Sequence, residues 1–297
     1  MLNASQLRGV HVPVITPFRT DGTLDLPSYR AYLTWLLQHR IQGVIVGGTT
    51  GESPALSWGE VEQLTLATQG AMNEAGAVLP LTIGTGTNDT ATSIHRTERA
   101  LALGADAVLA VVPYYNRPSP AGILAHYRAI AEVGLPVIAY NIPYRTGVEL
   151  STDTVLRILD IPNVIGLKDS SGGIRQLLEL SRRTSKSILC GEDAYFHAAL
   201  CAGAKGGILA SSCAFPGELA DVYEAVQQGR LPEAKSQFDR LLPLIELLYR
   251  EPNPAPLKWL LRHRGLIASS SLRLPMTEIS PALEQELTNE LGDIYLH

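Results

Sequence analysis

One lysine of this chain stands where it could act as a nucleophile. Lys168 ends the apolar segment NVIGLK, whereas the other lysines lie in polar or helical segments or before a predicted strand. An amine with the ordinary pKa of about 10.4 is charged at neutral pH, but apolar surroundings favour the neutral form. A neutral amine forms a Schiff base with a ketone or aldehyde. Lys168 is therefore the candidate nucleophile, and a buried ion pair with Asp169 is the structural alternative.

Three further strand-end segments carry groups that such chemistry needs. Tyr140 ends the predicted strand before Lys168, so its phenol could carry a proton to and from the reacting nitrogen. Thr49 and Thr50, in the glycine-rich segment GGTTGE, offer hydroxyl and N–H groups to a small carboxylate. Arg145 follows Tyr140 and could hold a second carboxylate through two hydrogen bonds. The alternatives are a core tyrosine, a plain tight turn and a solvated arginine.

Other chemistries lack their sequence signatures. The seven histidines show no HxxxH spacing, which gives no indication of a metal site. GGTTGE is not followed by the Lys and Ser/Thr of a phosphate-binding P-loop, and no GxSxG serine-hydrolase motif is found. We therefore expect an enzyme that needs neither a cofactor nor a metal.

The elements that must position these residues repeat in one pattern along the chain. Short apolar segments, each followed by a loop and an amphipathic helix-favouring stretch, are non-alternating, as is typical of parallel strands buried on both faces. Eight such units predict an α/β fold, a TIM (β/α)8 barrel, whose reactive groups lie at the carboxyl ends of the strands. A doubly wound open sheet is the competing fold, but no GxGxxG motif follows the first strand. The predicted strands are Val10–Ile15, Gly43–Val46, Leu81–Ile83, Ala107–Val112, Val137–Tyr140, Val164–Lys168, Ile188–Leu189 and Gly207–Ala210.

This repeating pattern ends near residue 231, and only helical patterns follow. We expect a barrel over residues 1–230 that contains the catalytic site. Residues 231–297 are expected to form a C-terminal helical extension packed on the barrel, with no linker of its own composition between them. Several of the earlier helices are predicted to begin after a capping residue, namely Ser57, Asn88, Ser119 and Ser151.

Composition narrows the class of protein. The 297 residues are 45% hydrophobic and 18% charged, enough apolar material for a large core. The net charge of −5 gives no general attraction to nucleic acid or to anionic membranes, and no apolar run reaches the length of a spanning helix. Three cysteines without CxxC spacing are expected to be small buried hydrophobic residues in a reducing cytoplasm, and not a disulfide framework or a zinc site. We expect a cytoplasmic protein without nucleic-acid or membrane partners.

Four motifs taken together resemble one known family. They are GTTGES at residues 48–53, PYYNRP at 113–118, YNIPYRTG at 140–147 and GLKDSSG at 166–172. In this order and spacing they are similar to the dihydrodipicolinate synthase and N-acetylneuraminate lyase superfamily of pyruvate-dependent aldolases. The resemblance runs from VITPF at Val14 into the C-terminal extension.

The resemblance implies roles for individual residues. Lys168 would form the Schiff base with pyruvate, and Tyr140, Thr50 and Tyr115 would form a proton relay. Tyr115 would reach the site from a neighbouring subunit, which implies a homo-oligomer, a dimer or a dimer of dimers. Thr49 and Thr50 would hold the pyruvate carboxylate. The remaining implied positions are Arg145 for the carboxylate of the second substrate, and Gly191 and Ile208 as backbone lining of the pyruvate pocket.

Arg145 and the segment NPAPLKW at residues 253–259 resemble the dihydrodipicolinate synthase branch. That branch condenses pyruvate with L-aspartate 4-semialdehyde to 4-hydroxytetrahydrodipicolinate, on the route to lysine and diaminopimelate. The alternatives are a catabolic aldolase, dehydratase or deaminase acting on a hydroxylated 2-oxo acid, and a non-catalytic barrel that binds a small carboxylate. Inhibition by lysine is expected to be weak or absent, because Thr92 stands where regulated relatives often present a glutamate.

Overall fold

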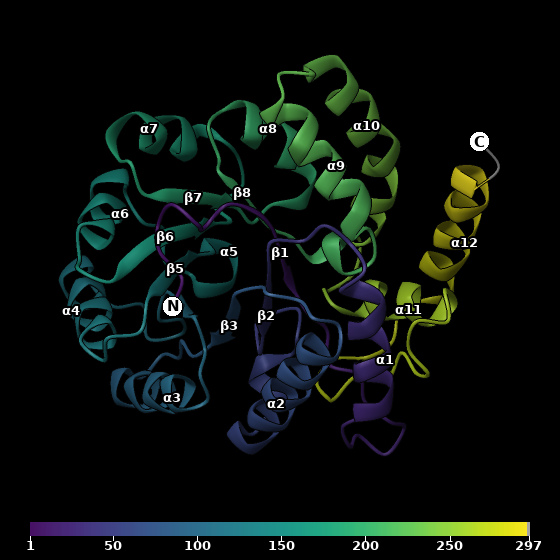
Figure 1. Cartoon of the computed structure of the whole chain (residues 1–297), viewed down its shortest axis with the longest axis horizontal. Coiled ribbons are helices and arrows are strands. Elements are labelled where there is room, and N and C mark those ends of the chain that lie inside the picture. The colour runs from purple at the N-terminus through teal and green to yellow at the C-terminus, as the bar shows by residue number, and fades with distance from the viewer. Residues whose placement is uncertain (296–297) are drawn as a thin grey trace. The chain divides into compact units, whose positions relative to one another are not determined.

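The computed structural model describes residues 1–295, and its central feature is a sheet of eight strands that closes on itself (Figure 1). The strands follow one another in chain order around the barrel, and β1 pairs in parallel with β8. This confirms the predicted (β/α)8 barrel. The strands are β1 Gly9–Pro13, β2 Gly43–Val46, β3 Leu81–Gly84, β4 Ala107–Val111, β5 Val137–Asn141, β6 Val164–Asp169, β7 Ser187–Cys190 and β8 Gly206–Ile208.

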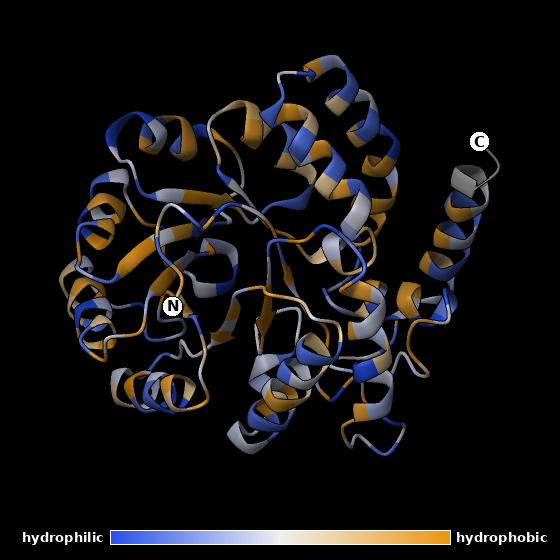
Figure 2. Ribbon diagram, in the orientation of Figure 1, coloured by the Kyte–Doolittle hydropathy of each residue, from blue (hydrophilic) through white to orange (hydrophobic). Residues whose placement is uncertain are grey.

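The strands are apolar because protein covers both of their faces. Every residue of β5 and β6 is buried, and the strands appear mainly hydrophobic in Figure 2. Inward-facing side chains such as Ile138, Tyr140, Leu189 and Ile208 share one buried cluster. The barrel interior is therefore filled with side chains, and the reactive groups must lie near the strand ends.

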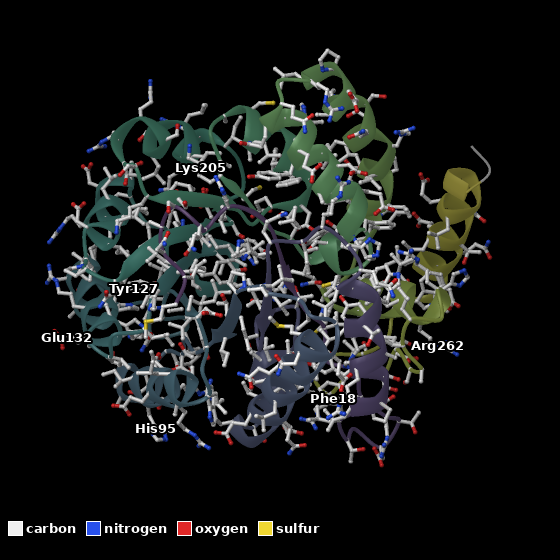
Figure 3. The ribbon with its side chains drawn as sticks, viewed as in Figure 1. Phe18, His95, Tyr127, Glu132, Lys205 and Arg262 are labelled. Carbon is white, nitrogen blue, oxygen red and sulfur yellow. The ribbon has the colours of Figure 1, made fainter. Side chains whose placement is uncertain are left out.

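The chain forms two compact units. The first comprises residues 1–11, 42–45 and 80–209, and so contains most of the strand residues. In this unit Tyr127, labelled in Figure 3, donates a hydrogen bond of 2.9 Å to the carbonyl of Ala110 and fixes α4 to β4. Its helices are α3 Thr90–Ala102, α4 Pro120–Ala131, α5 Pro143–Thr146, α6 Thr152–Leu159, α7 Arg175–Arg183 and α8 Phe196–Cys201.

The second unit comprises residues 12–41, 46–79 and 210–297. Within it α1 contacts α2, α9 contacts α10, and α12 contacts both α10 and α11. The helical composition predicted after residue 231 is confirmed, while the division into residues 1–230 and 231–297 stays a prediction. The helices are α1 Leu26–Leu36, α2 Trp58–Glu74, α9 Pro216–Gln227, α10 Leu231–Leu247, α11 Ala255–His263 and α12 Pro281–Tyr295. In the described part of the chain, no helix has the length and apolar character needed to cross a membrane.

The predicted helix caps are confirmed at three of four positions. Ser57, Ser119 and Ser151 each accept a backbone hydrogen bond through the side chain at the start of α2, α4 and α6. The prediction of Asn88 as the cap of α3 was wrong, because the neighbouring Asp89 takes that role. A carboxylate is favoured there, since it also complements the positive end of the helix dipole.

Candidate active site

Lys168 and Tyr140 occupy paired positions on adjacent strands at the carboxyl end of the barrel. The two residues are register partners between β5 and β6, and both side chains are buried. The Nζ atom of Lys168 lies 4.2 Å from the centre of the Tyr140 ring. The structure therefore brings the predicted amine and the predicted phenol together.

Burial changes the acid–base chemistry of the Lys168 amine. Desolvation lowers its pKa from 10.5 to about 8, an effect that nearby Asp193 and Glu192 partly oppose and that Arg145 reinforces. At pH 7 a pKa of about 8 leaves about 10% of the amine uncharged, compared with about 0.03% at the ordinary value. The surroundings thus supply the neutral nucleophile that imine formation requires.

The alternative of a Lys168–Asp169 ion pair is not supported. Successive residues of a strand point to opposite faces, which separates the two side chains. The Asp169 carboxylate instead accepts hydrogen bonds from Ser171 Oγ at 3.2 Å and from Asn141 Nδ2 at 3.4 Å. Burial raises the pKa of Asp169 to about 6, and Asp169 is not among the groups that shift the pKa of Lys168. The amine is therefore not paired with Asp169.

Gly191, directly after β7, leaves the space that the lysine side chain occupies. A Cβ atom at this position would lie 2.8 Å from Lys168 Cε and 2.2 Å from Ser170 Oγ, closer than real Cβ contacts allow. Ile208, the last residue of β8, is fully buried in the same cluster as Tyr140. Both residues therefore border the interior of the barrel, and their role as backbone lining of a pyruvate pocket stays a prediction.

Arg145 lies on α5, the short helix that follows β5. Its side chain is exposed, and the guanidinium carbon lies 5.7 Å from the centre of the Tyr144 ring. Its positive charge contributes to the lowered pKa of Lys168, so the two groups are within electrostatic range. This placement leaves Arg145 open to a ligand that carries a carboxylate.

Tyr115 lies in the loop after β4 and points away from its own protein interior. Its side chain is 89% exposed, and its backbone adopts a left-handed conformation with φ of 70°. A tyrosine this exposed is available to a second copy of the chain.

Thr49 and Thr50 lie in the second unit, in the turn that follows β2. Thr50 is buried, and its Oγ1 atom receives a hydrogen bond of 3.2 Å from Asn253 Nδ2. Glu52 ends the turn with φ of 57° and forms an ion pair of 2.7 Å with Lys258. Asn253 and the ion pair thus fix the turn that carries both threonines.

Lys258 was a competing lysine whose environment the sequence did not reveal. It is fully buried on α11, and its Nζ atom also donates to the carbonyl of Thr16 at 2.9 Å. Burial lowers the pKa of Lys258, and the charge of the Glu52 carboxylate and its hydrogen bond to the amine oppose this shift. Lys258 is a structural cation, unlike Lys168.

The acidic residues after β7 act electrostatically on Lys168, and the sequence analysis left them without a role. Glu192 and Asp193 both raise the pKa of Lys168 and so limit how far burial lowers it. Their position directly after a predicted strand is the sequence feature from which they could have been identified. Within the described residues, no group of three or more histidine, cysteine, aspartate or glutamate side chains is arranged as a metal site.

Comparison with known proteins gives one consistent relationship. The model of the dihydrodipicolinate synthetase family matches residues 6–294. The 4-hydroxy-tetrahydrodipicolinate synthase of Thiobacillus denitrificans is 39% identical over 283 residues, which cover 94% of both chains. Among solved structures, the synthase of Methylacidiphilum fumariolicum SolV is 35% identical with a TM-score of 0.93, covering 98% of this chain and 96% of that one. The dihydrodipicolinate synthase of Acinetobacter baumannii, solved in complex with pyruvate, is 34% identical with a TM-score of 0.93, covering 98% and 100%.

Proposed function

Because the chain belongs to the dihydrodipicolinate synthetase family, we propose that it is a Schiff-base-forming lyase that condenses pyruvate with L-aspartate 4-semialdehyde. The observation that carries this proposal is the buried Lys168 amine, which is not paired with the adjacent Asp169 and lies beside the Tyr140 ring. A protein that only bound a small carboxylate would have no use for an uncharged amine, and burying one is costly.

The reaction begins when the neutral amine of Lys168 attacks the keto carbon of pyruvate and water is lost. The resulting protonated imine withdraws electrons, so the pyruvate methyl group gives up a proton and becomes an enamine. The enamine carbon attacks the aldehyde carbon of the second substrate. The amine of that substrate then attacks the imine carbon, closes the ring and releases Lys168. Pyruvate and the semialdehyde thus give 4-hydroxytetrahydrodipicolinate and one water.

The surrounding residues divide the remaining tasks. Tyr140, Thr50 and the partner subunit's Tyr115 carry protons between the reacting groups, since phenols and hydroxyls can both donate and accept. Thr49 and Thr50 hold the pyruvate carboxylate, and Arg145 receives the carboxylate of the semialdehyde. The backbone of Gly191 and Ile208 lines the pyruvate pocket.

A relay that includes a residue of a second copy requires an oligomer. The exposure of Tyr115 supports a dimer as the smallest active unit, and the complete assembly is this dimer or a dimer of dimers. The reaction takes place in the cytoplasm on the route to lysine and diaminopimelate, and it uses no cofactor.

Trapping of the imine tests this proposal. The protein is incubated with pyruvate and borohydride, digested, and each lysine-containing peptide is examined by mass spectrometry. We expect one reduced pyruvate on the peptide that contains Lys168 and none on the peptide that contains Lys258, whose amine is buried against Glu52. The variant Lys168→Met is the control and should remain unlabelled. Labelling elsewhere, or none at all, contradicts the proposal.

The identity of the second substrate is tested separately. Aspartate semialdehyde and a set of 2-oxo-3-deoxy sugar acids are compared in coupled assays with the same enzyme preparation. We expect turnover of pyruvate with aspartate semialdehyde, and an Arg145→Leu variant should raise KM for the semialdehyde. Pyruvate should still be trapped on Lys168 in this variant at a pH above the pKa of the amine, where the lost charge of Arg145 has little effect on it. Turnover of the sugar acids alone would identify a catabolic aldolase instead.

A further inference from the structure

Gln176 of α7 joins the two ends of the loop that carries Arg145. This loop, residues 142–150, is referred to below as the Arg145 loop and includes α5. The Gln176 Nε2 atom donates a hydrogen bond of 2.7 Å to the carbonyl of Leu150, the last residue of the loop. Its Oε1 atom accepts one of 3.1 Å from Asn141 Nδ2, directly before the loop. A single side chain therefore bridges both ends.

The direction of each hydrogen bond in this bridge is fixed by its chemistry. The Leu150 carbonyl can only accept, so the Gln176 amide must present its NH2 group there and its oxygen to Asn141. Asn141 must then present its own NH2 group, which also lies 3.4 Å from Asp169 Oδ1. Reversing either amide would bring two NH2 groups or two carbonyl oxygens together. The bridge therefore has one stable arrangement.

The interior of the Arg145 loop is a single short turn that the rest of the molecule must hold in place. Its internal hydrogen bonds are local: Arg145 and Thr146 donate to the carbonyl of Ile142 at 3.1 and 3.0 Å, and Gly147 donates to Pro143 at 2.8 Å. They shape a single helical turn of four residues, which is too short to be stable alone. Burial of Thr146 packs one side of this turn, and the place of Arg145 depends in addition on where the two loop ends are held.

We propose that Gln176 is a positioning residue for Arg145, holding the Arg145 loop so that the guanidinium can receive the carboxylate of the second substrate. The inference rests on the proposed function, because it takes Arg145 as the group that binds the semialdehyde. Gln176 itself does not contact the substrate.

The location of Gln176 makes it suitable for substitution. Its side chain is only partly buried and borders an open pocket of about 360 Å³, which is also lined by Glu149, Ser171 and Glu179. Shortening this side chain enlarges a space that is already open instead of creating a cavity in the core. The variants Gln176→Ala and Gln176→Met are therefore expected to fold, and the second keeps the length of the side chain without its hydrogen bonds.

The first experiment follows the loop without using activity. Hydrogen exchange of the Arg145, Thr146 and Gly147 amides is measured in the full-length protein. We expect both Gln176 variants to exchange about 5- to 30-fold faster there, since each lost hydrogen bond changes an opening equilibrium by about fivefold. Glu179→Ala is the matched control, because it removes only the 2.8 Å bond from Thr152 to the same helix. Unchanged exchange in the variants, or equal acceleration in the control, overturns the inference.

The second experiment separates positioning from general damage. Gln176→Met should raise KM for aspartate semialdehyde about tenfold, while KM for pyruvate and borohydride trapping at Lys168 stay within twofold. In an Arg145→Leu background the same substitution should add nothing, because the group that it positions is gone. An additive effect in the double variant, or a parallel loss of pyruvate binding, contradicts the inference. If the unmodified protein does not use the semialdehyde, the proposed function fails, and the exchange data still decide whether Gln176 holds the loop.

Discussion

The pH dependence of imine formation follows from the environment of Lys168. Burial lowers its pKa from 10.5 to about 8, which corresponds to a destabilisation of the charged amine by about 3 kcal/mol. Only the uncharged amine attacks pyruvate, so the rate of imine formation should rise with pH and level off above about 8. At pH 7 the rate should be about 10% of its maximum, whereas an ordinary lysine would give about 0.03%.

The rate is measured by stopping the reaction of enzyme with saturating pyruvate at short times with borohydride and quantifying the labelled Lys168 peptide. The measurement is repeated between pH 6 and pH 10 in one buffer of constant ionic strength. A plateau that begins near pH 8 is the expected result. A rate that keeps rising tenfold per pH unit up to pH 10 would refute the argument, because it would mean that the amine has its ordinary pKa.

Glu192→Gln provides a directional control for this experiment. The Glu192 carboxylate raises the pKa of Lys168, so removing its charge should move the plateau to lower pH. The maximal rate should change little, since Glu192 does not take part in imine formation. A shift to higher pH would show that burial and charge do not set the pKa as described.

Three further perturbations test other parts of the structure. In Gly191→Ala the new Cβ would lie 2.8 Å from Lys168 Cε and would displace it, so imine trapping should fall about 100-fold while the circular dichroism spectrum stays unchanged. Trapping within threefold of the parent protein would argue against this contact. Lys258→Met leaves Glu52 buried without its partner and should lower the free energy of unfolding, measured with urea, by about 3–5 kcal/mol. Replacing both residues with methionine should recover most of this lost stability. Free lysine should inhibit the enzyme weakly or not at all, because the Thr92 hydroxyl donates a hydrogen bond to Asp89 and offers no charge to an ammonium group. Half-inhibition at submillimolar lysine would contradict this prediction.

The sequence was sufficient to predict the fold and to identify Lys168 as the candidate nucleophile. Short apolar segments that do not alternate are typical of strands covered on both faces, and eight of them separated by helical segments favour a closed parallel barrel. The carboxyl ends of such strands meet at one face, which is why Lys168 and Tyr140 could be paired before their coordinates were known. Both conclusions depend on local patterns that a linear sequence contains.

The tertiary structure alone decided the properties that depend on distant residues. The lowered pKa of Lys168 arises from desolvation by several strands, and the charge of Lys258 is balanced by Glu52, which lies 206 residues away in sequence. Gln176 likewise bridges two residues that no motif connects to it. Desolvation and hydrogen bonding depend on which groups surround an atom in space, and spacing along the chain does not specify those neighbours.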